Sequence, residues 1–124
     1  MKKLIALAAL AMLSSCAQYN PEAAGQPPAD HKAAVANYIK TTFFDPYSLR
    51  DVAISAPVPG IMFYQSGYVV CFQANAKNRM GGYTGVKRTA VLLRNDTVIS
   101  YLNGDARCFT PEFAMQAWPE MEAK

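Results

Sequence analysis

The chain contains 124 residues, of which 52% are hydrophobic and 17% are charged. This balance is typical of a folded protein and excludes a disordered one, and the length leaves room for one domain. The formal net charge is +3, but Lys2 and Lys3 belong to a predicted leader, so the remaining chain holds 10 basic and 9 acidic residues and a net charge of +1. A nearly neutral chain without a basic cluster excludes nucleic acid as the main partner.

The first residues have the pattern of a secretory signal peptide. Two lysines precede the apolar run Leu4–Leu13, which is ten residues long and uncharged. A helix that spans a bilayer requires about 20 apolar residues, so this run is too short for one. We therefore predict a signal peptide over residues 1–15, with a buried N-terminal helix as the alternative. The prediction places the mature protein outside the cytoplasm.

A cysteine motif follows the apolar run directly. Leu13-Ser14-Ser15-Cys16 contains an aliphatic residue, two small residues and a cysteine, and it resembles the lipobox of bacterial lipoproteins. The resemblance implies that the Cys16 thiol receives a diacylglyceryl group, that the chain is cut before Cys16, and that the new amine is acylated. Stable anchoring needs more than one acyl chain, and each buried CH₂ contributes about 0.8 kcal/mol. Three chains on Cys16 would hold the protein on a membrane.

The residue after the cysteine bears on the choice of membrane. In enterobacterial lipoproteins an aspartate at this position signals retention at the inner membrane, and here it is Ala17. The resemblance therefore implies an outer-membrane anchor, with the domain facing the periplasm or the cell surface. Because Ser15-Cys16-Ala17 also fits a small-x-small cleavage site, a soluble secreted protein cut after Ala17 is the alternative.

A spacer is predicted between the cysteine and the domain. From Ala17 to Pro28 the sequence holds three prolines, one glycine and small polar residues, with no hydrophobic period. Such composition predicts a flexible tether over residues 16–28. Twelve residues of random coil reach about 19 Å, enough to hold a small domain away from the lipid headgroups. Residues 29–124 are then the single globular domain.

Two cysteines remain once Cys16 is lipidated, and they are predicted to form a disulfide. Cys71 and Cys108 would lie in an oxidising compartment, where such pairs form and persist. The bridge would close a loop of 38 residues, which stabilises the fold by about 4 kcal/mol in the loop-entropy model. A reactive thiol is the alternative, but Cys71 lies in an apolar run without an activating base or cation.

The elements expected first along the domain are a helix and a short strand. Asp30 can cap a helix that begins near His31 and buries one apolar stripe. Asp45-Pro46 ends this helix, because the residue before a proline avoids the helical region. In residues 52–56 larger apolar residues alternate with smaller ones, which predicts a short strand, and Pro57–Gly60 is predicted to end this strand.

Three further strands and a second helix are predicted. The strands cover residues 67–74, 86–94 and 97–102, and the last two form a hairpin through Asn95-Asp96. Thr110-Pro111-Glu112 has the residues of a helix start, which predicts a short C-terminal helix through Trp118. The expected fold class is α+β: an N-terminal helix packed on an antiparallel sheet of about four strands, with a short C-terminal helix.

The stretch between the second and third predicted strands is the most unusual in composition. It is rich in asparagine, glycine and basic residues, and it contains one tyrosine. A structural turn explains the glycines and asparagines, whereas the charges and the tyrosine also suit an interface. A phosphate-binding loop is disfavoured, because the lysine precedes the glycines without Walker spacing. The candidate partner-binding residues are Asn75, Lys77, Asn78, Arg79, Gly81, Gly82, Tyr83 and Gly85.

A second resemblance rests on this stretch. The pattern Asp45-Pro46-x-Ser48, then Cys71 four residues before Asn-Ala-Lys-Asn, then Gly-Gly-Tyr-Thr-Gly is similar to one in small exported bacterial proteins, many of them lipoproteins. It covers roughly residues 40–95 of this chain. The group has smaller or aromatic residues where Arg79 and Met80 stand. The resemblance implies a shared fold and no particular chemistry.

No catalytic or metal site is expected. His31, the single histidine, is predicted at the junction of tether and helix, away from any carboxylate pair, and Ser48 has no histidine nearby to activate it. No cofactor is expected either. The sequence therefore predicts a non-catalytic binding or assembly module anchored to the envelope, with a protein or glycan partner. The alternatives are a small inhibitor-type or structural lipoprotein, or an enzyme.

Overall fold

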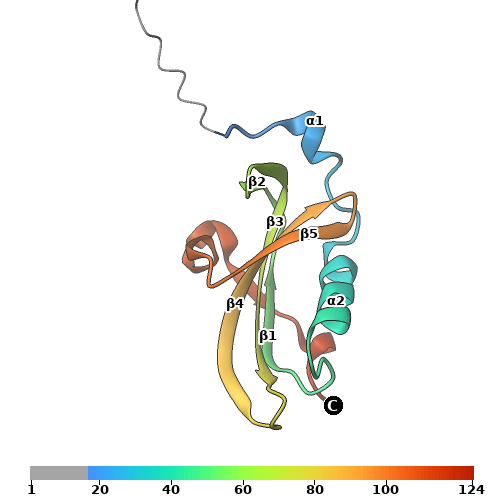
Figure 1. Cartoon of the computed structure of the whole chain (residues 1–124), viewed down its shortest axis with the longest axis vertical. Helices are drawn as coiled ribbons and strands as arrows, with labels where there is room; N and C mark the ends of the chain where they lie inside the picture. Colours follow the sequence, from blue (N-terminus) through green and yellow to red (C-terminus); the bar gives the residue numbers. More distant parts are fainter. Residues whose placement is uncertain (1–16) are drawn as a thin grey trace, which may run out of the picture.

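A six-stranded antiparallel sheet organises the chain in this computed structural model, which describes residues 17–124 (Figure 1). The fold is α+β, as predicted, but the sheet has six strands instead of about four. Two α-helices, α1 Pro21–Ala24 and α2 His31–Thr42, precede it. The strands are β1 Arg50–Ser55, β2 Val58–Met62, β3 Gln65–Lys77, β4 Tyr83–Arg94, β5 Thr97–Asn103 and β6 Met115–Ala117.

Strand β3 is the centre of the sheet. The order is β5-β4-β3-β1-β6, and β2 also pairs with β3. Strands β1 and β2 share one edge of β3, because Ile54 of β1 lies opposite Phe72 whereas Val58 of β2 lies opposite Val69. In Figure 1, α2 covers one face of the sheet and the orange-red turns that follow β5 lie on the other. The sheet therefore has two buried faces.

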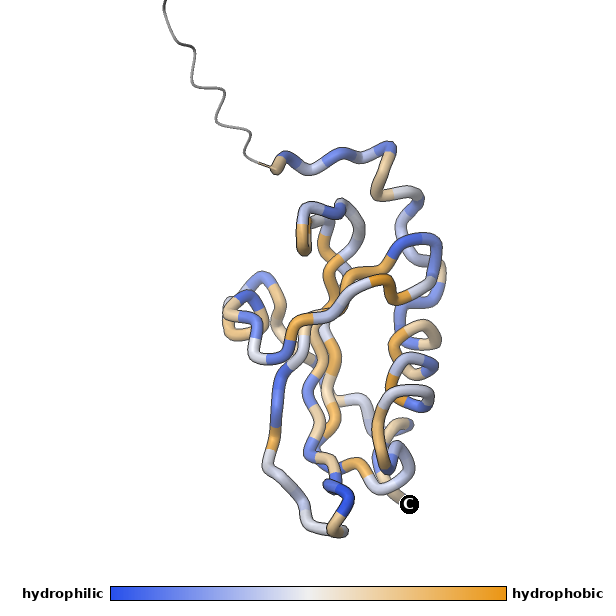
Figure 2. Tube along the Cα trace, viewed as in Figure 1, coloured by the Kyte–Doolittle hydropathy of each residue, from blue (hydrophilic) through white to orange (hydrophobic). Residues whose placement is uncertain are grey.

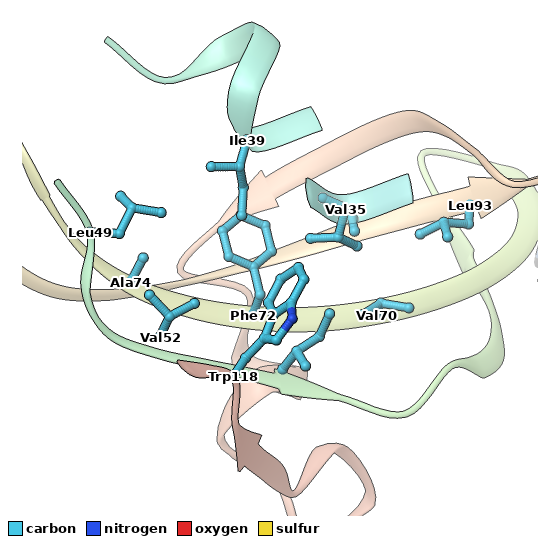
Figure 3. Packing of buried hydrophobic residues seen from close by; sticks show 11 residues of the cluster. Val35, Ile39, Leu49, Val52, Val70, Phe72, Ala74, Leu93 and Trp118 are labelled. Carbon is cyan, nitrogen blue, oxygen red and sulfur yellow. The ribbon is translucent and has the colours of Figure 1, made fainter. Parts of the chain in front are cut away.

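The predicted N-terminal helix is confirmed as α2, which covers the first core. The Asp30 carboxylate accepts a hydrogen bond from the Ala33 backbone N–H at 2.9 Å and caps the helix, as expected of aspartate at this position. Val35 and Ile39, one turn apart, are fully buried. They pack against Phe72 and its neighbours on the sheet (Figure 3). Hydrophobic residues line the side of α2 that faces the sheet (Figure 2).

The second core lies on the opposite face and contains the predicted disulfide. Alternate residues of a strand point to opposite faces, so Val69 and Cys71 of β3 lie here with Leu92 of β4. Cys71 and Cys108 are bonded, with their Cα atoms 5.5 Å apart. The bridge joins the central strand to the 3-10 helix η1 Ala106–Phe109.

The predicted C-terminal α-helix is wrong. Two further 3-10 helices, η2 Pro111–Phe113 and η3 Pro119–Met121, flank strand β6 in this region. Phe113 is buried in the core with the disulfide, whereas Trp118 is buried in the core under α2. The segment must pass from one face of the sheet to the other, which a single helix lying on one face cannot do.

Strand β2 lies where the sequence predicts a break at Pro57–Gly60. Pro59 and Gly60 are within this strand, opposite Tyr68 and Gly67 of β3. Proline is tolerated in an edge strand, where one row of backbone groups is left without a partner strand. Among the described residues, β2 pairs only with β3, so it is such an edge.

Part of the segment expected to be a flexible tether is folded against the domain. The Asn20 side chain accepts a hydrogen bond from the Glu22 N–H at 3.0 Å and caps α1, and Ala24 is fully buried. The Asn20 backbone N–H donates to Ser66 Oγ of β3 at 2.8 Å. Among residues 17–124, no helix is long and apolar enough to span a bilayer. The predicted signal peptide and Cys16 lie outside the described residues.

Candidate functional site

The hairpin of β3 and β4 is longer than predicted, so the candidate loop is mostly strand. Asn75 and Lys77 belong to β3, and Tyr83 and Gly85 belong to β4. Only residues 78–82 form the turn. The turn lies at the far end of this hairpin, opposite α1 (Figure 1).

Hydrogen bonds within the hairpin account for its asparagines and glycines. Asn78 Oδ1 accepts from the N–H groups of Met80 at 3.0 Å and Gly82 at 3.1 Å, which is the usual role of asparagine in a turn. Asn75 Oδ1 accepts from the Gly85 N–H at 3.0 Å beside a register shift. Gly85 has a φ of 93°, which favours glycine. The structural interpretation of this stretch therefore explains these residues.

Tyr83 is engaged in contacts within the domain and is half-buried. Its hydroxyl donates to the Ser48 carbonyl at 2.8 Å, and the Arg50 guanidinium lies 4.0 Å from the centre of its ring. The Lys77 ammonium lies 5.4 Å from the same ring. Arg79 lies over the ring of Phe44 at 5.7 Å. The Arg50 and Arg79 contacts join the hairpin to the start of β1 and to the segment before it, whereas the Lys77 contact lies within the hairpin.

A groove next to the hairpin is the better candidate site. Its volume is about 710 Å³, and it lies between the C-terminal half of α2 and strands β3, β4 and β5. Among the residues that line it, the hydroxyl of Thr89, which is buried, donates to the side-chain carbonyl of Asn103 at 2.9 Å. The aromatic residues that line the groove are Tyr38, Phe43, Phe72, Tyr101 and Phe109.

The charges of the groove are all of one sign. Lys87 and Arg88 line it, and among the described residues no carboxylate does. The sequence has no aspartate or glutamate between Asp51 and Asp96, so the surrounding strands add none. Arg88 Nη1 donates to the Cys108 carbonyl at 2.8 Å, and its guanidinium lies 4.7 Å from the Phe109 ring centre. The groove therefore favours a negatively charged group beside aromatic surface.

An unpaired strand edge borders the groove. Strand β5 ends opposite Thr89, and the Gly104 N–H donates to the Arg88 carbonyl at 2.8 Å. Within residues 17–124, the segment 83–87 of β4 has no strand on that side. Because Arg88 directs its backbone groups towards β5, Val86 directs its N–H and C=O towards the open edge. The Val86 side chain is 49% exposed.

None of the eight candidate residues predicted from the sequence lines this groove, although Tyr83 and Gly85 belong to the open segment 83–87 of β4. Lys77 and Tyr83 lie on the same hairpin as Val86 and Lys87, but they take part in the contacts described above. The groove itself combines residues from α2, β3, β4 and β5, and its aromatic residues occur singly in the sequence. The long stretch without acidic residues is the one sequence signal that points to it.

Within residues 17–124, neither a cluster of metal-ligating side chains nor the single histidine lies at this site. Among the described residues, no three histidine, cysteine, aspartate or glutamate side chains lie close enough to hold a metal ion. His31, at the start of α2, is not among the residues that line the groove. Burial and neighbouring Lys32 lower its pKa, and Asp30 and the Ser55 backbone oppose that shift.

The chain was compared with protein-family models, with curated proteins and with solved structures. None of the three comparisons gave a match.

Proposed function

We propose that this protein is an exported, lipid-anchored component of the bacterial envelope that binds an extended, acidic segment of a partner protein without catalysis. The observation that supports the proposal is the aromatic and basic groove beside the open edge of β4. An acidic peptide fits both features, because its backbone can pair with the edge while a carboxylate meets Lys87.

The binding mode follows from the alternation of side chains in a strand. A peptide that pairs with Val86 would extend the sheet by one strand, and its backbone hydrogen bonds would supply affinity. Every second side chain of the peptide would then point to the face that carries the groove. An apolar side chain there would contact Phe43 and Tyr101, and an acidic one would lie near Lys87.

The proposed location rests on the leader and the cysteines. The lipobox at Cys16 supports acylation, and Ala17 favours the outer membrane. The Cys71–Cys108 disulfide is a bond that persists in oxidising compartments such as the periplasm. We therefore place the binding domain in the periplasm or on the cell surface, held by its N-terminal lipid.

Peptide selection tests the binding proposal. The full chain, purified from membranes in a non-ionic detergent, is immobilised and used to select from a phage-displayed library of random peptides of about twelve residues. We expect enrichment of aspartate and glutamate next to alternating apolar residues. A selected peptide should bind about tenfold more weakly to Lys87→Glu at low ionic strength.

The matched control has the same charge change elsewhere. Lys32 is exposed on α2 and does not line the groove, so Lys32→Glu should leave the affinity within about twofold of the original. Peptide binding should also slow hydrogen exchange of the Val86 amide. Selected peptides without acidic residues, or equal affinity for both variants, would contradict the proposal.

A further inference from the structure

The turn between β2 and β3 presents two aromatic side chains to solvent. Met62 pairs with Gln65, so Phe63 and Tyr64 are the two central residues of a tight hairpin. Phe63 is 60% exposed and Tyr64 is 89% exposed. We call these two residues the aromatic tip.

The backbone of the aromatic tip is in a conformation that its residues disfavour. Phe63 has a φ of 48° and Tyr64 has a φ of 65°, in the left-handed region that bulky residues rarely adopt. Asparagine and glycine are the residues that normally occupy such a turn. Neither aromatic side chain is buried in a core, so packing within the domain does not account for this choice.

The chain enters the domain at the same end of the molecule. The Asn20 N–H is bonded to Ser66 Oγ at 2.8 Å, and Ser66 is two residues beyond Tyr64. Tyr19 lies beside Tyr68 of β3, where burial and the neighbouring phenol raise its pKa. Figure 1 shows α1 and the β2–β3 turn together at one end of the long axis, opposite the turn of the β3–β4 hairpin.

The distance available to the predicted anchor is short. Cys16 precedes Asn20 by four residues, which reach about 14 Å when fully extended. Asn20 is held to Ser66, so the freely extending spacer is shorter than the twelve residues expected from composition. An acylated Cys16 would therefore keep the end that carries the aromatic tip close to the lipid headgroups.

We infer that the aromatic tip is a membrane-contact site that inserts Phe63 and Tyr64 into the interface of the phospholipid bilayer. The inference rests on the lipid anchor of the proposed function. Amphipathic aromatic rings favour the headgroup level of a bilayer, and a two-residue tip at the anchored end reaches it first. The domain then stands on the membrane with the β3–β4 hairpin, and the open edge of β4, directed away from it.

Fluorescence quenching by brominated lipids tests the depth of the tip. The full lipidated chain is reconstituted into phosphatidylcholine vesicles that carry bromine on their acyl chains, in the variants Tyr64→Trp and Met80→Trp. Met80 is 95% exposed in the turn at the opposite end, so it is the matched control. The native Trp118 is buried and common to both. We expect the added indole of Tyr64→Trp to lose at least about threefold more fluorescence than that of Met80→Trp.

Two further measurements separate this inference from the proposed function. Flotation with vesicles reports attachment to the membrane, incorporation of labelled palmitate reports acylation of the anchor, and Phe63→Trp repeats the quenching test with a second variant. A protein that floats and is labelled, yet shows equal quenching at both ends, overturns the membrane contact and leaves the anchor intact. A protein that neither floats nor is labelled overturns the anchor, and this inference with it.

Discussion

The β2–β3 and β4–β5 turns share one backbone geometry and differ in residue type. Each is a two-residue hairpin turn with both central residues at positive φ, between 48° and 65°. Asn95-Asp96 is a favourable pair for this geometry, and the Asp96 carboxylate accepts from the Ala29 N–H at 2.9 Å. Phe63-Tyr64 is an unfavourable pair with both rings exposed. The residues of the β4–β5 turn are explained by folding, whereas those of the β2–β3 turn require a reason outside the fold.

The largest expected effect comes from removing the ion pair that holds β2. Arg107 donates to the Asp105 carboxylate at 2.7 Å and to the Ile61 carbonyl at 2.8 Å, next to the aromatic tip. Asp105→Ala leaves the Arg107 guanidinium without its carboxylate, and we expect a loss of about 2–3 kcal/mol in the free energy of unfolding, because Arg107 is only partly buried. Urea unfolding measures it. A loss as small as that of a surface substitution would show that β2 does not depend on this pair.

Exchanging the residues of the favourable turn is the next test. Asn95→Phe with Asp96→Tyr places aromatic residues at positive φ and removes the carboxylate bonded to Ala29. We expect about 2 kcal/mol of destabilisation, measured by thermal unfolding. An unchanged melting temperature would mean that aromatic residues adopt this turn without cost, and the comparison between the turns would fail.

The reverse exchange should stabilise the protein. Phe63→Asn with Tyr64→Gly relieves the disfavoured backbone, and we expect a gain of about 1–2 kcal/mol, which raises the melting temperature by roughly 5–10 °C. The same variant should lose the membrane contact of the aromatic tip. If the melting temperature falls instead, the rings stabilise the fold, and their exposure does not indicate an external partner.

The turn of the β3–β4 hairpin provides a smaller effect. Asn78→Ala removes two hydrogen bonds from its side chain to backbone N–H groups, and we expect a loss of about 1 kcal/mol. Binding of a selected peptide should stay within about twofold, because Asn78 does not line the groove. Loss of peptide binding in a variant that still folds would show that this turn takes part in binding.

The smallest expected effect is a dependence of the free energy of unfolding on pH under acidic conditions. Burial of Asp105 raises its pKa, but hydrogen bonds and charge from Arg107 outweigh burial, so the pKa lies below 3.8. The unfolded chain then binds the proton more readily, so the pair stabilises the fold above about pH 4 and this stability is lost as the pH falls through the lowered pKa. The free energy of unfolding of the Asp105→Asn variant, measured with urea, should depend less on pH in this range than that of the original chain.

The elements that the sequence predicted well are those with local signals. The helix start at Asp30 and the hairpin through Asn95-Asp96 follow from single residues with known preferences, and the disulfide follows from the cysteine count and the predicted compartment. Strand β2 was missed because proline and glycine normally end strands, and its position at an edge of β3 is a tertiary property. The C-terminal helix was wrong because the burial of Phe113 and Trp118 on opposite faces outweighs a local helix start.

The candidate site was less predictable than the fold. Unusual composition pointed to residues 75–85, but most of that composition serves the turn and the bulge of the hairpin. The groove depends on where β5 ends and on how far α2 reaches across the sheet, and no local sequence motif predicts either feature. The aromatic tip was missed because Phe63 and Tyr64 look ordinary until their backbone angles are known.

The strand order also has a consequence for the order of folding. Strands β2, β3, β4 and β5 are joined by consecutive hairpins, so each pair can form without any other part of the sheet. Strand β1 can pair only after β3 has formed. Its other neighbour, β6, lies far along the chain, since Ala53 pairs with Ala117. Closing such a long loop is slow. We expect the hairpins to form first during folding, and the β1–β6 edge to close last.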